Sequence, residues 1–128
     1  MTLDSSALLA ILFGEYGHLD LIDRILNAGS VRVGTPTLVE TGMVFAGRRR
    51  TKAIGEVEQL VQELGVTVVP FGEREWRAAM DAFLRFGRGR HAAALNFGDC
   101  LAYAAASAAG DSLLFVGDAF RKTDITSA

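Results

Sequence analysis

The chain has 128 residues, which is enough for one domain with a single hydrophobic core and too few for two domains of ordinary size. Hydrophobic residues make up 50% of it, which argues against disorder, and no apolar run reaches the roughly 18–20 residues that span a bilayer. The net charge of −2 argues against a general polyanion binder, and the single cysteine excludes an internal disulfide and a cysteine-based zinc cluster. The start lacks a signal-peptide pattern, so we expect a cytoplasmic protein without a membrane segment.

Short apolar runs alternate with helical patterns along the chain, which predicts an α/β fold in one domain spanning residues 1–128. Ser5 and Ser6 are suitable N-caps for the first helix. The first half is predicted to contain a strand at 1–4, helices at 7–13 and 18–28, a strand at 31–33 and a helix from Thr35 to about Arg48.

The second half continues the alternation and ends in an apolar run typical of a parallel strand covered on both faces. We predict helices at 52–64, 73–86 and 96–109, strands at 66–69 and 113–116, a Gly- and Arg-rich loop at 87–95 and a polar, irregular tail from Gly117. The apolar stripe on the helix at 73–86 is interpreted as core or as a dimer contact. Together the elements predict a parallel sheet of about four to five short strands flanked by helices.

Four acidic residues are predicted to meet at the carboxyl edge of this sheet. Asp4 ends the first strand, Glu40 lies in the first turns of the helix after the second strand, and Asp118 follows the fourth. Asp99 begins a helix that runs into the fourth strand, so its start lies at the same edge. Clustered carboxylates repel each other, and Mg²⁺ or Mn²⁺, which favour oxygen ligands, would relieve that repulsion. The alternative is that each acid is only a helix cap, a turn residue or a partner of a helix dipole.

Four segments, in this order, resemble the motifs of the VapC-type PIN-domain toxins: LDSSALLAIL, TPTLVETGMVF, GRGRHAAALNFGDCLAYAAA and LLFVGDAFRKTDI. The resemblance covers nearly the whole chain. It implies a PIN domain and an endoribonuclease that depends on Mg²⁺ or Mn²⁺. It also implies the toxin component of a type II toxin–antitoxin system, with RNA as substrate, a cognate antitoxin as partner and a homodimer as the assembly.

The resemblance places four acids in the catalytic site: Asp4, Glu40, Asp99 and Asp118. Asp4 and Asp99 would hold the metal, and a metal-activated water would attack the phosphodiester. Relatives often carry an acid where this chain has Ala119. Asp124 is therefore an alternative to Asp118 as the fourth acid, or a helper.

Several polar residues near these acids are candidate helpers. Ser6, or Ser5, would contribute its hydroxyl, and Asn96 is either a helix cap or a ligand for a phosphate or water. Arg88 and Arg90 lie in the loop that leads to Asp99, and we expect them to contact RNA, since phosphate contacts are usually made by arginine and lysine.

Other functions remain as alternatives. A DNA- or structure-specific PIN-like nuclease would use the same metal core, and a non-catalytic PIN-like module would only bind a partner. An aspartyl phosphatase also places an aspartate after its first strand, but it usually has a second aspartate two residues later, where this chain has Ser6.

Overall fold

The computed structural model describes residues 1–49 and 53–128. Its strands are β1 (Thr2–Leu3), β2 (Arg32–Gly34), β3 (Thr67–Val69) and β4 (Leu113–Leu114), all parallel in the order β3-β2-β1-β4. The helices are α1 (Ser5–Leu12), α2 (His18–Leu26), α3 (Thr35–Arg49), α4 (Ala53–Glu63), α5 (Glu73–Phe86) and α6 (Phe97–Ala108), followed by a 3₁₀ turn, η1 (Phe120–Lys122). The predicted α/β fold with a parallel sheet is confirmed.

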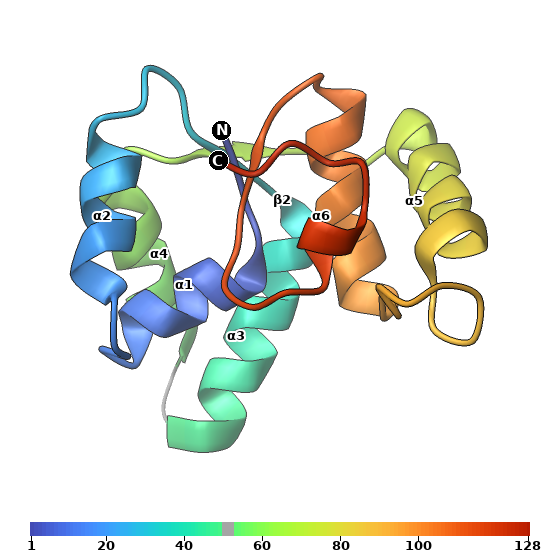
Figure 1. The fold of residues 1–128 in the computed structure, drawn as a ribbon. Coiled ribbons are helices and arrows are strands. Elements are labelled where there is room, and N and C mark those ends of the chain that lie inside the picture. Colours follow the sequence, from blue (N-terminus) through green and yellow to red (C-terminus); the bar gives the residue numbers. More distant parts are fainter. Residues whose placement is uncertain (50–52) are drawn as a thin grey trace.

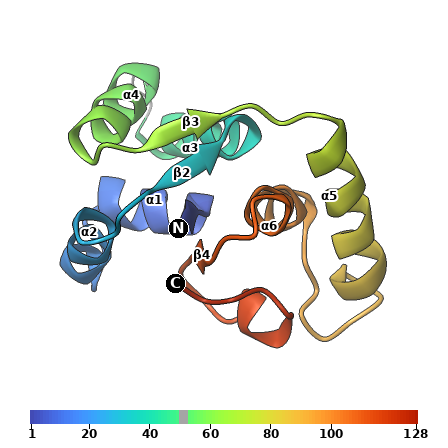
Figure 2. The ribbon, with the colours of Figure 1, turned by 90° about the horizontal axis from the view of Figure 1, so that it is seen from above.

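The helices cover both faces of the sheet (Figures 1 and 2). On one side, α1, α2 and α4 pack on the strands through a cluster that includes Leu3, Leu8, Ile25 and Val61. On the other side, α5 and α6 pack together and against β4 and η1 through a second cluster that includes Leu95. Both clusters are made of side chains that are almost fully buried, so burial of apolar surface holds the short strands in register.

The start of α1 differs from the prediction, which had a serine cap and a helix from residue 7. The N-cap is Asp4, whose Oδ2 accepts a hydrogen bond of 3.0 Å from the backbone N–H of Ser6. An aspartate is as good an N-cap as a serine, and its carboxylate also stabilises the positive end of the helix. The helix therefore begins at Ser5, and both serines lie in its first turn.

The last strand and the tail also differ from the prediction. β4 ends at Leu114 because the backbone N–H of Val116 leaves the ladder and donates to the Ser6 hydroxyl at 3.0 Å. The tail is not wholly irregular, since Ser127 forms a parallel bridge with Leu113. The tail thus lies along the β4 edge of the sheet and covers part of its backbone.

Two further expectations concern α4 and α5. The helix predicted from Lys52 is described from Ala53 onward, and Lys52 lies outside the described residues. The apolar stripe of α5 is not core, because Trp76 and Leu84 are each 53% exposed; α5 packs on α6 through smaller side chains such as Ala82. In the described ranges, no helix combines the length and apolar character that crossing a membrane requires.

The topology brings three acid-bearing segments to one edge of the sheet. All strands are parallel, so their carboxyl ends share the edge that faces downward in Figure 1. Asp4 directly follows β1, and α3, which carries Glu40, directly follows β2. The α6 helix, with Asp99 in its first turn, runs back toward β4 and so also starts at this edge.

Candidate active site

Asp4 is a buried carboxylate, and one of its two oxygens accepts hydrogen bonds from the described residues whereas the other accepts none. Its side chain is 3% exposed, and Oδ2 accepts hydrogen bonds from the backbone N–H and the hydroxyl of Ser6. Within the described part of the chain, the buried Oδ1 atom has no hydrogen-bond partner. A buried carboxylate oxygen without a partner is costly, and a bound ligand would remove that cost.

One oxygen of the Asp99 carboxylate, at the start of α6, also accepts a hydrogen bond from a backbone N–H. Its backbone N–H donates to Asn96 Oδ1 at 2.8 Å, and the backbone N–H of Asn96 donates to Asp99 Oδ2 at 3.0 Å. This reciprocal pair is a capping box, and it confirms Asn96 as a helix cap. The position of the Asp99 carboxylate is therefore set by backbone atoms.

Glu40 lies between the helices that carry these two aspartates. Its Oε1 atom accepts a hydrogen bond from the hydroxyl of Ser5. Its Oε2 atom lies against the backbone of Gly98, where an added Cβ would be only 1.7 Å away. Glu40 thus contacts the start of α1 on one side and the start of α6 on the other.

The pKa values of Asp4 and Asp99 are both raised. Burial raises the pKa of Asp4 to about 6; the hydrogen bonds from Ser6 lower it, and the charges of Asp99 and Glu40 raise it further. Burial also raises the pKa of Asp99; the bond from Asn96 opposes the shift and the charge of Glu40 adds to it. The structure therefore brings Asp4, Glu40 and Asp99 together into one electrostatically coupled group.

The structure does not bring Asp118 or Asp124 into contact with this group. The Asp118 side chain is 86% exposed and pairs with Arg121 at 3.7 Å. Asp124 accepts hydrogen bonds of 2.6 Å from the Tyr103 hydroxyl and from Arg85. Burial and the bond to Asp124 raise the pKa of Tyr103 to about 12, so the phenol stays protonated and holds the tail on α6.

The two arginines predicted to contact RNA differ in their surroundings. Arg88 lies near enough to Asp99 for its charge to lower the pKa of that carboxyl. Arg90 stacks over the Phe83 ring, with its guanidinium carbon 5.4 Å from the ring centre, and so faces α5. Of the two, Arg88 is the one whose charge acts on an acid of this group.

Sequence reasoning missed Gly98 and did not identify the separate contacts of the two serines. Ser6 contacts Asp4, whereas Ser5 contacts Glu40. The only signal for Gly98 was a glycine in the first turn of an alanine-rich helix, where glycine lowers helix stability.

The donor atoms suit a hard divalent cation. They are all oxygens, and one of them, Asp4 Oδ1, is buried and unsatisfied. Across residues 1–49 and 53–128, no three His, Cys, Asp or Glu side chains already stand in a metal-ligating arrangement. In their present positions Glu40 and Asp4 accept hydrogen bonds from the hydroxyls of Ser5 and Ser6, and Asp99 accepts one from the backbone N–H of Asn96.

Comparison with known proteins supports a single family. The family model described as "PIN domain" matches residues 1–125. A VapC ribonuclease of Mycobacterium bovis is 40% identical over 126 residues, covering 98% of this chain and 91% of the relative. A ribonuclease VapC of Mycolicibacterium smegmatis is 37% identical over 128 residues, covering 99% and 98%. The crystal structure of Mycobacterium tuberculosis VapC20, described as a sarcin–ricin loop cleaving toxin, shares the fold with a TM-score of 0.77, 15% identity and coverage of 99% and 97%.

Proposed function

Because the chain belongs to the PIN-domain family, with VapC ribonucleases among its relatives, we propose that it is an endoribonuclease that depends on Mg²⁺ or Mn²⁺ and acts as the toxin of a toxin–antitoxin pair. The observation that supports this most is the group of Asp4, Glu40 and Asp99, whose charges act on other members of the group and in which the buried Oδ1 of Asp4 has no hydrogen-bond partner among the described residues. A protein that only binds a partner has no use for such a repulsive cluster.

The three acids would act as ligands and as holders of the reacting water. Asp4 Oδ1 and the Asp99 carboxylate would hold the cation, and Glu40 would hold a ligand water or the ion itself. A bound Mg²⁺ or Mn²⁺ supplies a water of lowered pKa and offsets charge on the phosphate. Arg88, whose charge acts on Asp99, would contact a neighbouring phosphate of the substrate.

The proposal is tested by cleavage of a structured RNA and of a DNA of the same sequence. Wild-type protein should cut the RNA with Mg²⁺ or Mn²⁺ and lose activity in EDTA. Asp99→Asn should abolish cleavage while keeping the fold, because it preserves shape and removes charge. Asp20→Asn, on the exposed face of α2, is the matched control and should cut normally. Full activity in EDTA would refute the mechanism, and preferential cleavage of DNA would favour the alternative nuclease.

Asp118 and Asp124 are expected to behave differently. Asp118 is exposed, and its segment is tied to the acids where Val116 donates to Ser6. We propose that Asp118 turns toward the site when metal and RNA bind, whereas Asp124 holds the tail. Asp118→Asn should therefore slow cleavage without changing the melting temperature, and Asp124→Asn should lower the melting temperature. The reverse pattern would make Asp124 the fourth acid.

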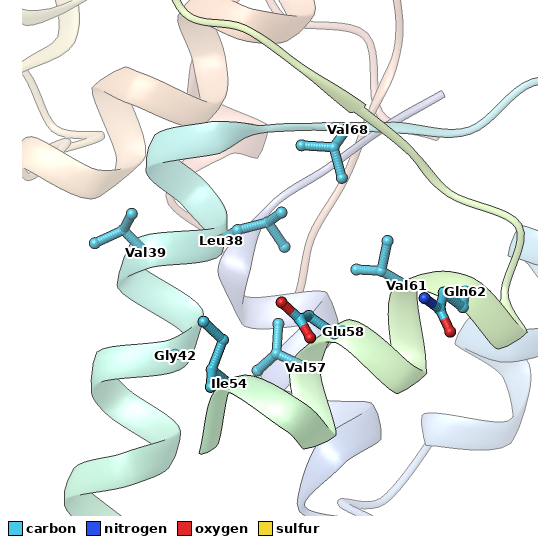
Figure 3. A pocket seen from close by; sticks show the side chains of 9 residues that line it. All are labelled: Leu38, Val39, Gly42, Ile54, Val57, Glu58, Val61, Gln62 and Val68. Carbon is cyan, nitrogen blue, oxygen red and sulfur yellow. The ribbon is translucent and has the colours of Figure 1, made fainter. Parts of the chain in front are cut away.

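The antitoxin is proposed to occupy an apolar groove of about 820 Å³ between α3 and α4 (Figure 3). Its apolar lining comes from Leu38, Val39, Ile54, Val57, Val61 and Val68. The sequence of α4, AIGEVEQLVQE, carries acidic and no basic residues, so the partner should be an apolar helix with basic flanks. An arginine of that partner directed at the three carboxylates would inhibit cleavage.

The groove is tested by co-purification of the chain with the product of the neighbouring antitoxin gene. Ile54 is 71% exposed in the groove, so Ile54→Asp should weaken the complex and leave cleavage intact. Leu84→Asp, on the exposed stripe of α5, is the control and should bind normally. If Leu84→Asp alone weakens the complex, the partner lies elsewhere. Homodimerisation stays a prediction, which light scattering of the purified chain tests.

A further inference from the structure

Glu40 occupies the space that a side chain at position 98 would fill. A Cβ added to Gly98 would lie 1.7 Å from Glu40 Oε2, 2.5 Å from Cδ and 2.8 Å from Oε1. The carboxylate thus rests directly on the backbone of α6. Any residue other than glycine would force it to move.

The backbone at this position does not itself require glycine. Gly98 lies in the first turn of α6 and is not among the residues with positive φ. The rest of the helix is rich in buried alanines, whose Cβ atoms pack without difficulty. A glycine that lowers helix stability and has no conformational role is explained by the carboxylate it accommodates.

The opposite side of the carboxylate is held by a hydrogen bond. Ser5 is 8% exposed, and its hydroxyl donates to Glu40 Oε1. Ser5 follows Asp4 at the start of α1, and Gly98 precedes Asp99 at the start of α6. The two contacts therefore connect Glu40 to the neighbours of both aspartates and fix its distance from each.

We propose that Ser5 and Gly98 are positioning residues that form a two-sided seat for the Glu40 carboxylate. The inference rests on the proposed nuclease function. The seat keeps the third acid between the other two before metal and RNA bind. Neither residue touches the substrate; each acts through Glu40.

The test is a double-mutant cycle between Gly98→Ala and Glu40→Asp. The added methyl should displace Glu40 by more than 1 Å, and a misplacement of that size can cost about 100-fold in kcat. Aspartate is one methylene shorter and leaves room for the methyl. In the Glu40→Asp background, Gly98→Ala should therefore change kcat by less than about 3-fold. Mn²⁺ binding by calorimetry, without RNA, should weaken about 10-fold in Gly98→Ala and show the same rescue.

The control is Gly47→Ala on α3, where the added Cβ meets nothing within 4 Å, and it should leave kcat and Mn²⁺ binding unchanged. Ser5→Ala, which adds no atoms next to the helix, provides a second double-mutant cycle with Glu40→Asp. It should lower kcat about 10-fold in the chain that keeps Glu40 and should have little effect in the Glu40→Asp background. Wild-type rates in both Gly98→Ala and Ser5→Ala would refute the proposed positioning role. Equal losses of kcat in the Glu40 and Glu40→Asp backgrounds would refute it as well. Absence of cleavage by the wild-type chain would instead refute the proposed function.

Discussion

Asp4→Asn should make the metal-free protein more stable while abolishing its activity. Burial raises the pKa of Asp4 from 3.8 to about 6. At 1.36 kcal/mol per pKa unit, keeping the carboxylate charged at neutral pH costs about 3 kcal/mol. Asparagine keeps the acceptor for Ser6 and removes the charge, although its new N–H group costs about 1 kcal/mol if it finds no partner. The net gain is about 2 kcal/mol, or a rise of about 5–10 °C in melting temperature.

The stability difference between Asp4→Asn and the wild-type chain should depend on pH. Between pH 3.8 and about 6 the folded chain binds more protons at Asp4 than the unfolded chain does, so wild-type stability from this group falls as pH rises through that window. Thermal unfolding followed by circular dichroism in EDTA should show the advantage of Asp4→Asn at pH 7.5 and its loss near pH 4. A variant that melts below wild type at pH 7.5, or an advantage independent of pH, would refute the reasoning. Asp20→Asn, on the exposed face of α2, serves as the control for exchanging an aspartate for an asparagine.

Two further predictions concern the packing around α5 and α6. Gly87→Ala would place its Cβ 2.4 Å from the Phe83 carbonyl oxygen, so it should destabilise the fold by about 1–3 kcal/mol in urea unfolding, whereas Gly47→Ala should not; equal stability of the two would show that the turn after α5 adjusts freely. Tyr103→Phe removes the hydrogen bond to Asp124 and should cost about 1–2 kcal/mol without slowing RNA cleavage, and a cleavage defect at full stability would show that the tail takes part in the site.

The three acids of the site could be predicted from the sequence because their convergence follows from chain topology. Asp4 follows a strand, and Glu40 and Asp99 lie near helix starts, so a parallel sheet suffices to bring them to one edge. The prediction needed no knowledge of side-chain orientation. It therefore survived errors of a few residues in the element bounds.

What could not be predicted depends on tertiary contacts between distant residues. The end of β4 is set by a hydrogen bond from Val116 to Ser6, 110 positions away. The surroundings of Asp124 are set by Tyr103 and Arg85, which belong to other elements. No local pattern encodes these partners, so neither the strand boundary nor the placement of the tail acid was accessible from periodicity or turn signals.

The double use of the Asp4 carboxylate has a genetic consequence. One oxygen caps α1, and the other is buried and has no hydrogen-bond partner among the described residues. Asparagine retains the capping acceptor and removes the repulsion, so the simplest inactivating substitution is also a stabilising one. If the chain is toxic, cells that survive its expression should often carry substitutions at this position that inactivate the protein without unfolding it. Such alleles would still sequester antitoxin, and would therefore act in trans on an intact copy in the same cell.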